Sequence, residues 1–237
     1  MSNQPGKPFD KDLIQYVGPF GYSSNTHNFW DDFEDVLKEK ILQYKIIKIK
    51  IYYSSDEENK EQEKYLIGIS LTYQNLFTGE KKELEHKGTD KITGTREFNI
   101  DSGDYLKKFH INFNDDFDHI SQIGFTTFRN REIFVGIKDG LDKTIKQNDE
   151  DYILLGTYGY FEQRMDGIGC LFADKKLFLN THLFGYFMMK YLIKHNETFK
   201  KEWDDNYKKL SIDFQFLWRA VTLPDAIFSC IIKFCSF

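Results

Sequence analysis

Short apolar runs separated by polar turn residues extend from about residue 13 to residue 175. Within these runs apolar and polar side chains alternate with a period of two, which predicts β-strands with one buried face. The clearest strands are expected at residues 42–53, 65–73, 83–87, 107–113, 121–127, 133–137, 152–160 and 167–171. Turn signals such as Thr78-Gly79-Glu80 separate them. The pattern therefore predicts a mainly β, antiparallel domain.

The hydrophobic period changes to that of a helix after residue 175, which predicts a C-terminal α-helical extension over residues 176–237. One helix carries an apolar stripe made of Phe199, Trp203, Tyr207, Leu210, Phe214 and Leu217. Further apolar stripes consist of Leu179, Leu183, Phe187 and Tyr191, and of Ile227, Ile231 and Phe234 behind Pro224. No segment has the roughly 20 apolar residues that a membrane span needs. The stripes predict a surface for protein partners or for self-association.

The charge balance argues against nucleic acid and anionic lipid as partners. The chain has 32 basic and 37 acidic residues and a net charge of -5, so it has no broad positive field. Lys45, Lys48 and Lys50 cluster locally, but they alternate with isoleucines. They are therefore expected on the solvent side of a strand. The polar run at residues 54–64 is interpreted as an exposed loop.

Residues 1–12 contain no apolar segment that resembles a cleaved secretory signal, so we expect a flexible N-terminus and an intracellular protein. Cys170, Cys230 and Cys235 are too few for a disulfide framework, and reduced thiols fit that compartment. The sequence shows no metal-ligand spacing, phosphate-binding loop or nucleophile motif. We therefore expect no cofactor, no metal and no enzymatic activity.

Four sequence blocks occur in a fixed order over about 160 residues. They are Gly18-Pro19-Phe20-Gly21 with Phe29-Trp30-Asp31-Asp32, then Phe98-Asn99-Ile100-Asp101 with Asp104-Tyr105-Leu106, then residues 120–127, and finally the glycine-punctuated hairpin at residues 156–169. In this order and spacing the blocks resemble the jacalin-related lectin domain of the mannose-binding type.

The resemblance implies a β-prism over residues 13–175. Such a prism consists of three four-stranded antiparallel sheets that face one another around a pseudo-threefold axis. It also implies reversible, metal-independent sugar binding at one end of the prism, with no catalytic machinery. In the family, the sugar site forms where an opening loop meets the last hairpin.

The resemblance places a candidate sugar site on the last hairpin, centred on Asp166. An ionised Asp can accept two charge-assisted hydrogen bonds from sugar hydroxyls, while the adjacent amides of Gln163 and Arg164 donate to a third oxygen. The walls of the site would come from Tyr158, Tyr160 or His27. A second interpretation remains open, in which Asp166 only closes the hairpin by hydrogen-bonding to its own turn.

Glu162 stands four residues before Asp166, where the family has glycine. The opening-loop glycine also falls on another residue, near Thr26 or His27. A non-glycine residue at a positive φ would cost about 1 kcal/mol, and the carboxylate of Glu162 would occlude the groove or repel an acidic sugar. We therefore expect weak or absent binding of mannose and galactose, with a gain on Glu162→Gly.

Two functions remain open from the sequence. The first is a non-enzymatic interaction or assembly subunit that uses the prism as a scaffold and the aromatic helical tail as a docking surface. The alternative is an intracellular carbohydrate-binding lectin with a metal-independent site at the last hairpin. The replaced site residues and the apolar tail favour the first function.

Overall fold

The computed structural model describes residues 14–21, 28–37, 43–55, 63–76, 79–101, 103–113, 120–138, 141–145, 151–175 and 178. These residues contain twelve β-strands and one short π-helical turn, η2 (Phe33–Leu37). The strands are β1 (Ile14–Gly21), β2 (Asn28–Asp31), β3 (Tyr44–Ser55), β4 (Glu63–Asn75), β5 (Lys81–Lys87), β6 (Gly94–Asn99), β7 (Leu106–Phe113), β8 (Ile120–Thr127), β9 (Glu132–Gly136), β10 (Leu141–Ile145), β11 (Tyr152–Phe161) and β12 (Met165–Asp174).

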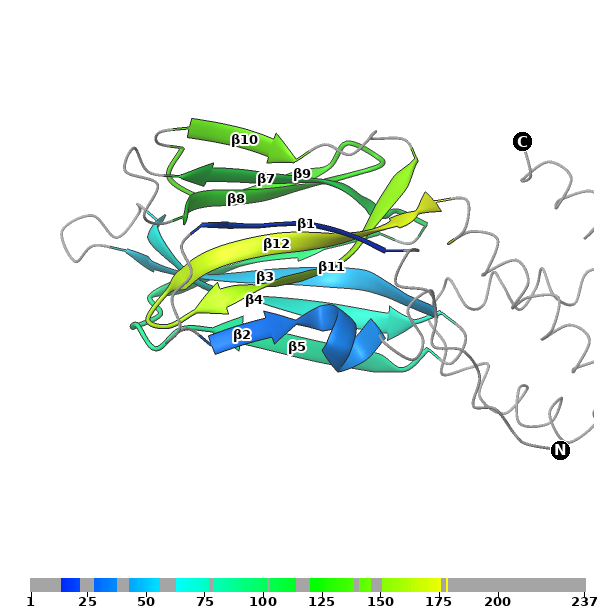
Figure 1. The fold of residues 1–237 in the computed structure, drawn as a ribbon, viewed down its shortest axis with the longest axis horizontal. Helices are drawn as coiled ribbons and strands as arrows, with labels where there is room; N and C mark the ends of the chain where they lie inside the picture. Colours follow the sequence, from blue (N-terminus) through cyan, green and yellow to red (C-terminus); the bar gives the residue numbers. More distant parts are fainter. Residues whose placement is uncertain are drawn as a thin grey trace, which may run out of the picture.

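The strands form three four-stranded sheets in which all paired neighbours are antiparallel (Figure 1). Sheet A has the order β1-β12-β11-β2, sheet B has β5-β4-β3-β6, and sheet C has β10-β7-β8-β9. Every pair of sheets is in contact, since β11 meets both β3 and β7, and β4 meets β8. Three sheets that enclose one core make a β-prism, which confirms the predicted architecture for the described residues.

Alternation along the strands explains how the core is filled. In β3 the side chains of Ile49 and Ile51 are 0% exposed, whereas Lys48 and Lys50 beside them are only partly buried. Large aromatic residues that are also fully buried complete the core, namely Tyr73, Phe109, Phe125 and Phe172. Burying one such side chain contributes about 1.5 to 3 kcal/mol, so these positions dominate the stability of the prism.

Lys45 differs from its neighbours in β3. The sequence predicts it on the solvent side, yet it is only 5% exposed. Its Nζ atom donates a hydrogen bond to the backbone oxygen of Asp101 at 3.1 Å and lies 4.7 Å from the ring centroid of Tyr105. A backbone acceptor and an aromatic face together replace water around the ammonium group, which is why this lysine can be buried.

Each sheet contains at least one aromatic ring that lies over a glycine on the neighbouring strand. Examples are Tyr158 over Gly169 in sheet A, Tyr53 over Gly94 in sheet B and Phe134 over Gly124 in sheet C. In each case a β-carbon on the glycine would come within 2.4 Å of the ring. A larger residue at any of these glycines would displace the ring that covers its strand.

All eight strands named from the sequence are confirmed, but four further strands were not named, namely β1, β2, β6 and β10. The loop expected at residues 54–64 is shorter in the structure, because β3 extends to Ser55 and β4 begins at Glu63. The predicted tail helices, with all their stripe residues, lie outside the described residues. Within the described part of the chain, no helix has the length and apolar character required to cross a membrane.

Candidate functional site

Both ends of the connection between β1 and β2 lie against the hairpin that joins β11 to β12. The last residue of β1, Gly21, pairs with Gly167 of β12, and the first residue of β2, Asn28, pairs with Phe161 of β11. The β11–β12 turn and the facing ends of β1 and β2 lie on the left side of the prism in Figure 1. Sheet A therefore brings two chain segments that are distant in sequence to one end of the prism.

Two glycines let β1 approach β12 closely enough to form this junction. Gly21 has a φ of +113°, and a β-carbon there would lie 2.1 Å from the backbone oxygen of Asp166. Gly18 has a φ of +106°, and a β-carbon there would lie 2.9 Å from the Cα atom of Gly169. Only glycine meets both the backbone conformation and the space available.

The tip of the hairpin is also held from sheet B, by the connection between β5 and β6. The backbone N–H of Thr89 donates to the oxygen of Glu162 at 3.1 Å, and the N–H of Asp90 donates to the oxygen of Gln163 at 2.9 Å. Gly88 permits this approach, because a β-carbon there would lie 2.2 Å from the oxygen of Gln163. The hairpin tip is thus fixed by backbone hydrogen bonds from a second sheet.

Arg164 strengthens the same contact with its side chain. Its Nε atom lies 2.8 Å from Oδ2 of Asp90, and its guanidinium carbon lies 3.6 Å from the ring centroid of Tyr65 in β4. The charged fork is therefore stacked on one side and hydrogen-bonded on the other. These contacts, which we call the Arg164 clamp, hold the hairpin tip against sheet B.

A buried carboxylate holds the start of η2 against β11. Asp32 is 0% exposed, and its Oδ2 atom accepts hydrogen bonds from the Tyr73 hydroxyl at 2.7 Å and from the Thr157 N–H at 2.8 Å and hydroxyl at 3.0 Å. On its other oxygen, Oδ1, it is hydrogen-bonded to Nε2 of His86 at 2.8 Å. The ring of Trp30 stacks on His86 with centroids 5.2 Å apart. Sheets A and B are therefore joined behind the hairpin by a satisfied polar network.

The pKa values around this network follow from burial and from the Asp32 charge. Burial, followed by the charge of Asp32, raises the pKa of the Tyr73 hydroxyl and of the Cys170 thiol well above their usual values. Both groups therefore stay protonated at neutral pH. The hydroxyl of Tyr73 is then available as a donor to Asp32, and Cys170 is an unreactive core residue.

The structure places the predicted site residues at different depths. Asp166 is partly buried near the start of β12 with its Oδ2 atom fully buried, while Glu162 and Gln163 are exposed at the turn. The amide N–H groups of Gln163 and Arg164 make no hydrogen bond to any other described residue. Within the described part of the chain, those two donors remain candidates for a ligand beside Asp166.

The sequence predicted Tyr158 as a wall of the sugar site and backbone strain at Glu162, and the structure differs on both points. Tyr158 is 5% exposed and packs against Tyr16 with ring centroids 5.1 Å apart. Among the described non-glycine residues only Asn130 has a positive φ, so the predicted backbone strain at Glu162 is wrong. The hairpin accommodates a side chain at residue 162 because the turn does not use a left-handed conformation there. His27 lies outside the described residues.

Three contributors to this end of the prism were not identified from the sequence. Asp90 and Gly88 belong to sheet B and reach the hairpin only through the fold, and Asp32 matched a sequence block without an assigned role. The polar Thr89-Asp90 pair after a strand indicated a turn, but no local signal indicated that this turn contacts residues 162–164. Such a contact needs the three-dimensional arrangement of two sheets.

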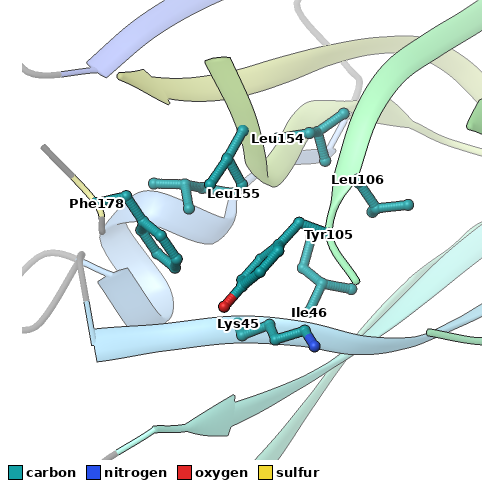
Figure 2. Close-up of a pocket in the computed structure, with 8 residues that line it drawn as sticks. Lys45, Ile46, Tyr105, Leu106, Leu154, Leu155 and Phe178 are labelled. Carbon is teal, nitrogen blue, oxygen red and sulfur yellow. The ribbon is translucent and has the colours of Figure 1, made fainter. Parts of the chain in front are cut away.

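The opposite end of the prism contains a cavity that is too small for a ligand. Figure 2 shows it between Lys45, Tyr105, Leu154, Leu155 and Phe178. Its volume is about 10 Å³, at the lower limit for one water molecule. Phe178 is 0% exposed and packs edge-on against Tyr105 with centroids 5.7 Å apart, so it closes this end. Within the described residues, no group of three or more His, Cys, Asp or Glu side chains could hold a metal ion.

No protein-family model and no curated protein sequence matches the chain. Solved structures do match it. An agglutinin from Calystegia sepium is 23% identical with a TM-score of 0.52, over 69% of this chain and 98% of the agglutinin. A mannose-binding jacalin-related lectin from Ananas comosus is 12% identical with a TM-score of 0.52, over 68% of this chain and 98% of the lectin. Artocarpin in complex with mannotriose is 17% identical with a TM-score of 0.52, over 68% and 98%.

Identities this low show a shared fold. The β-prism of this chain is the fold of jacalin-related lectins, as the sequence blocks predicted. A fold by itself does not determine function, which has to be argued from the site.

Proposed function

We propose that this chain is a non-enzymatic carbohydrate-binding protein whose sugar site lies at the β11–β12 hairpin beside the end of β1. The ligand class is a neutral sugar, held without a metal ion. Because Oδ2 of Asp166 is buried, its Oδ1 atom accepts the hydrogen bonds from two hydroxyl groups, and the amides of Gln163 and Arg164 donate to a third oxygen.

One observation carries the proposal, namely the junction of Gly21 with Asp166 and Gly167. The pairing of Gly21 with Gly167 places the start of the β1–β2 connection against the residue that bears the candidate carboxylate. The pairing of Asn28 with Phe161 places its end against the other arm of the same hairpin. A carboxylate and two amide donors therefore lie where the ends of β1 and β2 meet the β11–β12 hairpin, which suits a small polar ligand.

The rigidity of the hairpin also supports sugar binding. A shallow site makes few contacts, so affinity depends on avoiding the entropy cost of ordering a loop. The backbone bonds from Thr89 and Asp90 and the Arg164 clamp fix the hairpin before any ligand arrives. The proteins that share this fold include a mannose-binding lectin and a lectin in complex with mannotriose, which supports the same class of ligand.

The assembly function has less support. Its residues are those of the apolar tail stripes, which lie outside the described residues. In the described part of the chain the large exposed apolar side chains are Tyr16, Phe29 and Phe134. The similar solved structures include an agglutinin, a mannose-binding lectin and artocarpin in complex with mannotriose, which favours carbohydrate binding.

A glycan array probed with the full chain tests the proposal, followed by calorimetric titration of the sugars that it retains. Asp166→Asn should abolish binding, because it removes the charge that strengthens two hydrogen bonds. Asp101→Asn is the matched control, since Asp101 is an exposed carboxylate whose ion pair with Arg131 is remote from the hairpin. Absence of binding to any neutral glycan, or equal binding by the Asp166→Asn variant, would refute the assignment.

A further inference from the structure

A row of four residues crosses the outer face of sheet A directly beside the candidate site. Gly21 pairs with Gly167, Gly167 with Tyr160, and Tyr160 with Phe29, so the row spans all four strands. Paired residues of an antiparallel sheet project to the same face, which makes Tyr160 and Phe29 neighbours on the surface. Their ring centroids are 5.3 Å apart and the rings are tilted by 51°.

The aromatic half of this row is open to solvent. Phe29 is 56% exposed, more than any other large hydrophobic residue in the described part of the chain, and Tyr160 is partly exposed. The two rings would be better shielded from water if they served only to stabilise the sheet. Their exposure on two paired strands next to the candidate site favours a surface that contacts a ligand.

Polar groups lie one row below the two rings. Asp31 pairs with Tyr158, and its carboxylate accepts hydrogen bonds from the Phe33 N–H at 2.9 Å and from the Tyr16 hydroxyl at 3.2 Å. Asp31 lies two residues from Phe29 on the same face of β2, so its carboxylate and the Tyr16 hydroxyl bonded to it lie beside the aromatic pair. An apolar ring surface bordered by a hydroxyl and a carboxylate matches a sugar ring, which has C–H faces and a rim of hydroxyl groups.

We propose that Phe29 and Tyr160 form a second saccharide subsite, so that the ligand of this chain is a neutral oligosaccharide of at least two rings. This inference rests on the proposed function and extends it. The first ring binds at Asp166, and the next ring stacks on Phe29 and Tyr160. The strand spacing allows one ligand to reach both subsites. Gly167, next to Asp166, and Phe29 are two strand spacings apart, or about 10 Å.

The charges around the two subsites define the class of sugar. Glu162 and Asp166 lie on the hairpin, and Asp31 lies below the aromatic pair. The positive charge of Arg164 is already paired with Asp90 at 2.8 Å. Carboxylates therefore lie beside both proposed sugar subsites. Their negative charge disfavours sialylated or sulfated glycans relative to neutral ones.

The chain provides a matched control for the aromatic pair. Phe134 on the outer face of sheet C is 43% exposed, and its ring lies 5.1 Å from that of His110 with a tilt of 53°. Its exposure and ring partner therefore resemble those of Phe29, but it lies on a different sheet. Phe134→Ala reports the effect of removing an exposed aromatic ring without touching the proposed subsite.

The experiment titrates mannose and mannotriose, into the millimolar range, onto the full chain and its Phe29→Ala, Tyr160→Ala and Phe134→Ala variants. The expected result is that Phe29→Ala and Tyr160→Ala each weaken mannotriose binding about threefold to tenfold and leave mannose binding unchanged. Phe134→Ala should change neither. Far-UV circular dichroism verifies that each variant is folded.

Four results would overturn the subsite. If mannotriose binding is unchanged in both variants, the subsite is absent and the proposed function stands. If mannose and mannotriose weaken equally, the rings support the hairpin and bind no second sugar. If sedimentation velocity shows that Phe29→Ala converts a dimer into a monomer, the patch is a contact between copies of this chain. Absence of any sugar binding by the unmodified chain would refute both the subsite and the proposed function.

Discussion

A β-carbon on Gly21 would lie 2.1 Å from the backbone carbonyl oxygen of Asp166, although the two residues are far apart in the sequence. This approach joins β1 to β12 at the end of the prism where the candidate carboxylate lies. Gly21 also has a φ of +113°, a conformation that disfavours side chains. The site therefore depends on a glycine that contributes no chemical group to it.

Gly21→Ala should destabilise the prism by about 2 to 3 kcal/mol and abolish sugar binding, because the strand must move away from Asp166. Gly103→Ala is the control. Gly103 also has a positive φ, +67°, but a β-carbon there would meet only the Nη2 atom of Arg129 at 3.6 Å. That variant should lose about 1 kcal/mol and retain binding. Urea denaturation and sugar titration measure both quantities, and equal losses in the two variants would contradict the role of the junction.

Asp32→Ala should lower the free energy of unfolding by about 3 kcal/mol or more. The substitution leaves the Tyr73 hydroxyl, the Thr157 N–H and the His86 ring without their buried acceptor. Glu97→Gln at the exposed ion pair with Lys48 should change the same quantity by less than about 0.5 kcal/mol. A small effect of Asp32→Ala in urea denaturation would show that the network is not a structural link between sheets A and B.

The sequence predicted the strands whose two faces differ in polarity. β3 alternates isoleucine with lysine, and it was predicted almost to its ends. β6 was not predicted, because Gly94, Thr95 and Arg96 give no alternation and only Phe98 of this strand is buried. β2 is only four residues long, which is too short for a periodic signal. Pairing with a longer strand supplies the stability that the local sequence of such segments lacks.

The sequence could predict only the part of the candidate site that lies on one hairpin. Asp166, Gln163 and Arg164 are neighbours in sequence, so a motif could identify them. The pairing of Phe29 with Tyr160 and the ion pair of Arg164 with Asp90 connect residues that are far apart along the chain. Such contacts follow from the order of strands within a sheet and from the packing of one sheet on another, which local periodicity does not specify.

Arg164→Ala should loosen the hairpin tip without unfolding the prism. We expect the free energy of unfolding to fall by about 1 kcal/mol or less, because the side chain is partly exposed. Amide hydrogen exchange at Thr89 and Asp90 should become faster, since their acceptors lie on the hairpin.

Arg131→Ala is the matched control for the Arg164 clamp. Arg131 also combines an ion pair, to Asp101 at 2.6 Å, with a ring contact, to Phe98 at 5.0 Å. Its removal should leave exchange at Thr89 and Asp90 unchanged. If both arginine variants accelerate that exchange equally, the clamp has no local role.

Glu162→Ala should strengthen mannose binding as much as Glu162→Gly does. Because Glu162 does not have a positive φ, glycine has no conformational advantage over alanine at this position. Any gain must come from removing the carboxylate from the rim of the site. Calorimetric titration compares the two variants. A gain for Glu162→Gly alone would show that the bound hairpin adopts a left-handed conformation at residue 162.

Amide-resolved NMR of the isotope-labelled full chain during a titration with mannotriose tests the central claim most directly. We predict chemical-shift changes at Gly21, Gln163, Arg164 and Gly167, because these backbone groups surround Asp166. Residues at the opposite end of the prism, such as Tyr105 and Phe178, should not shift. The account is contradicted if millimolar mannotriose shifts no amide of the hairpin, or if the changes cluster around Tyr105 and Phe178.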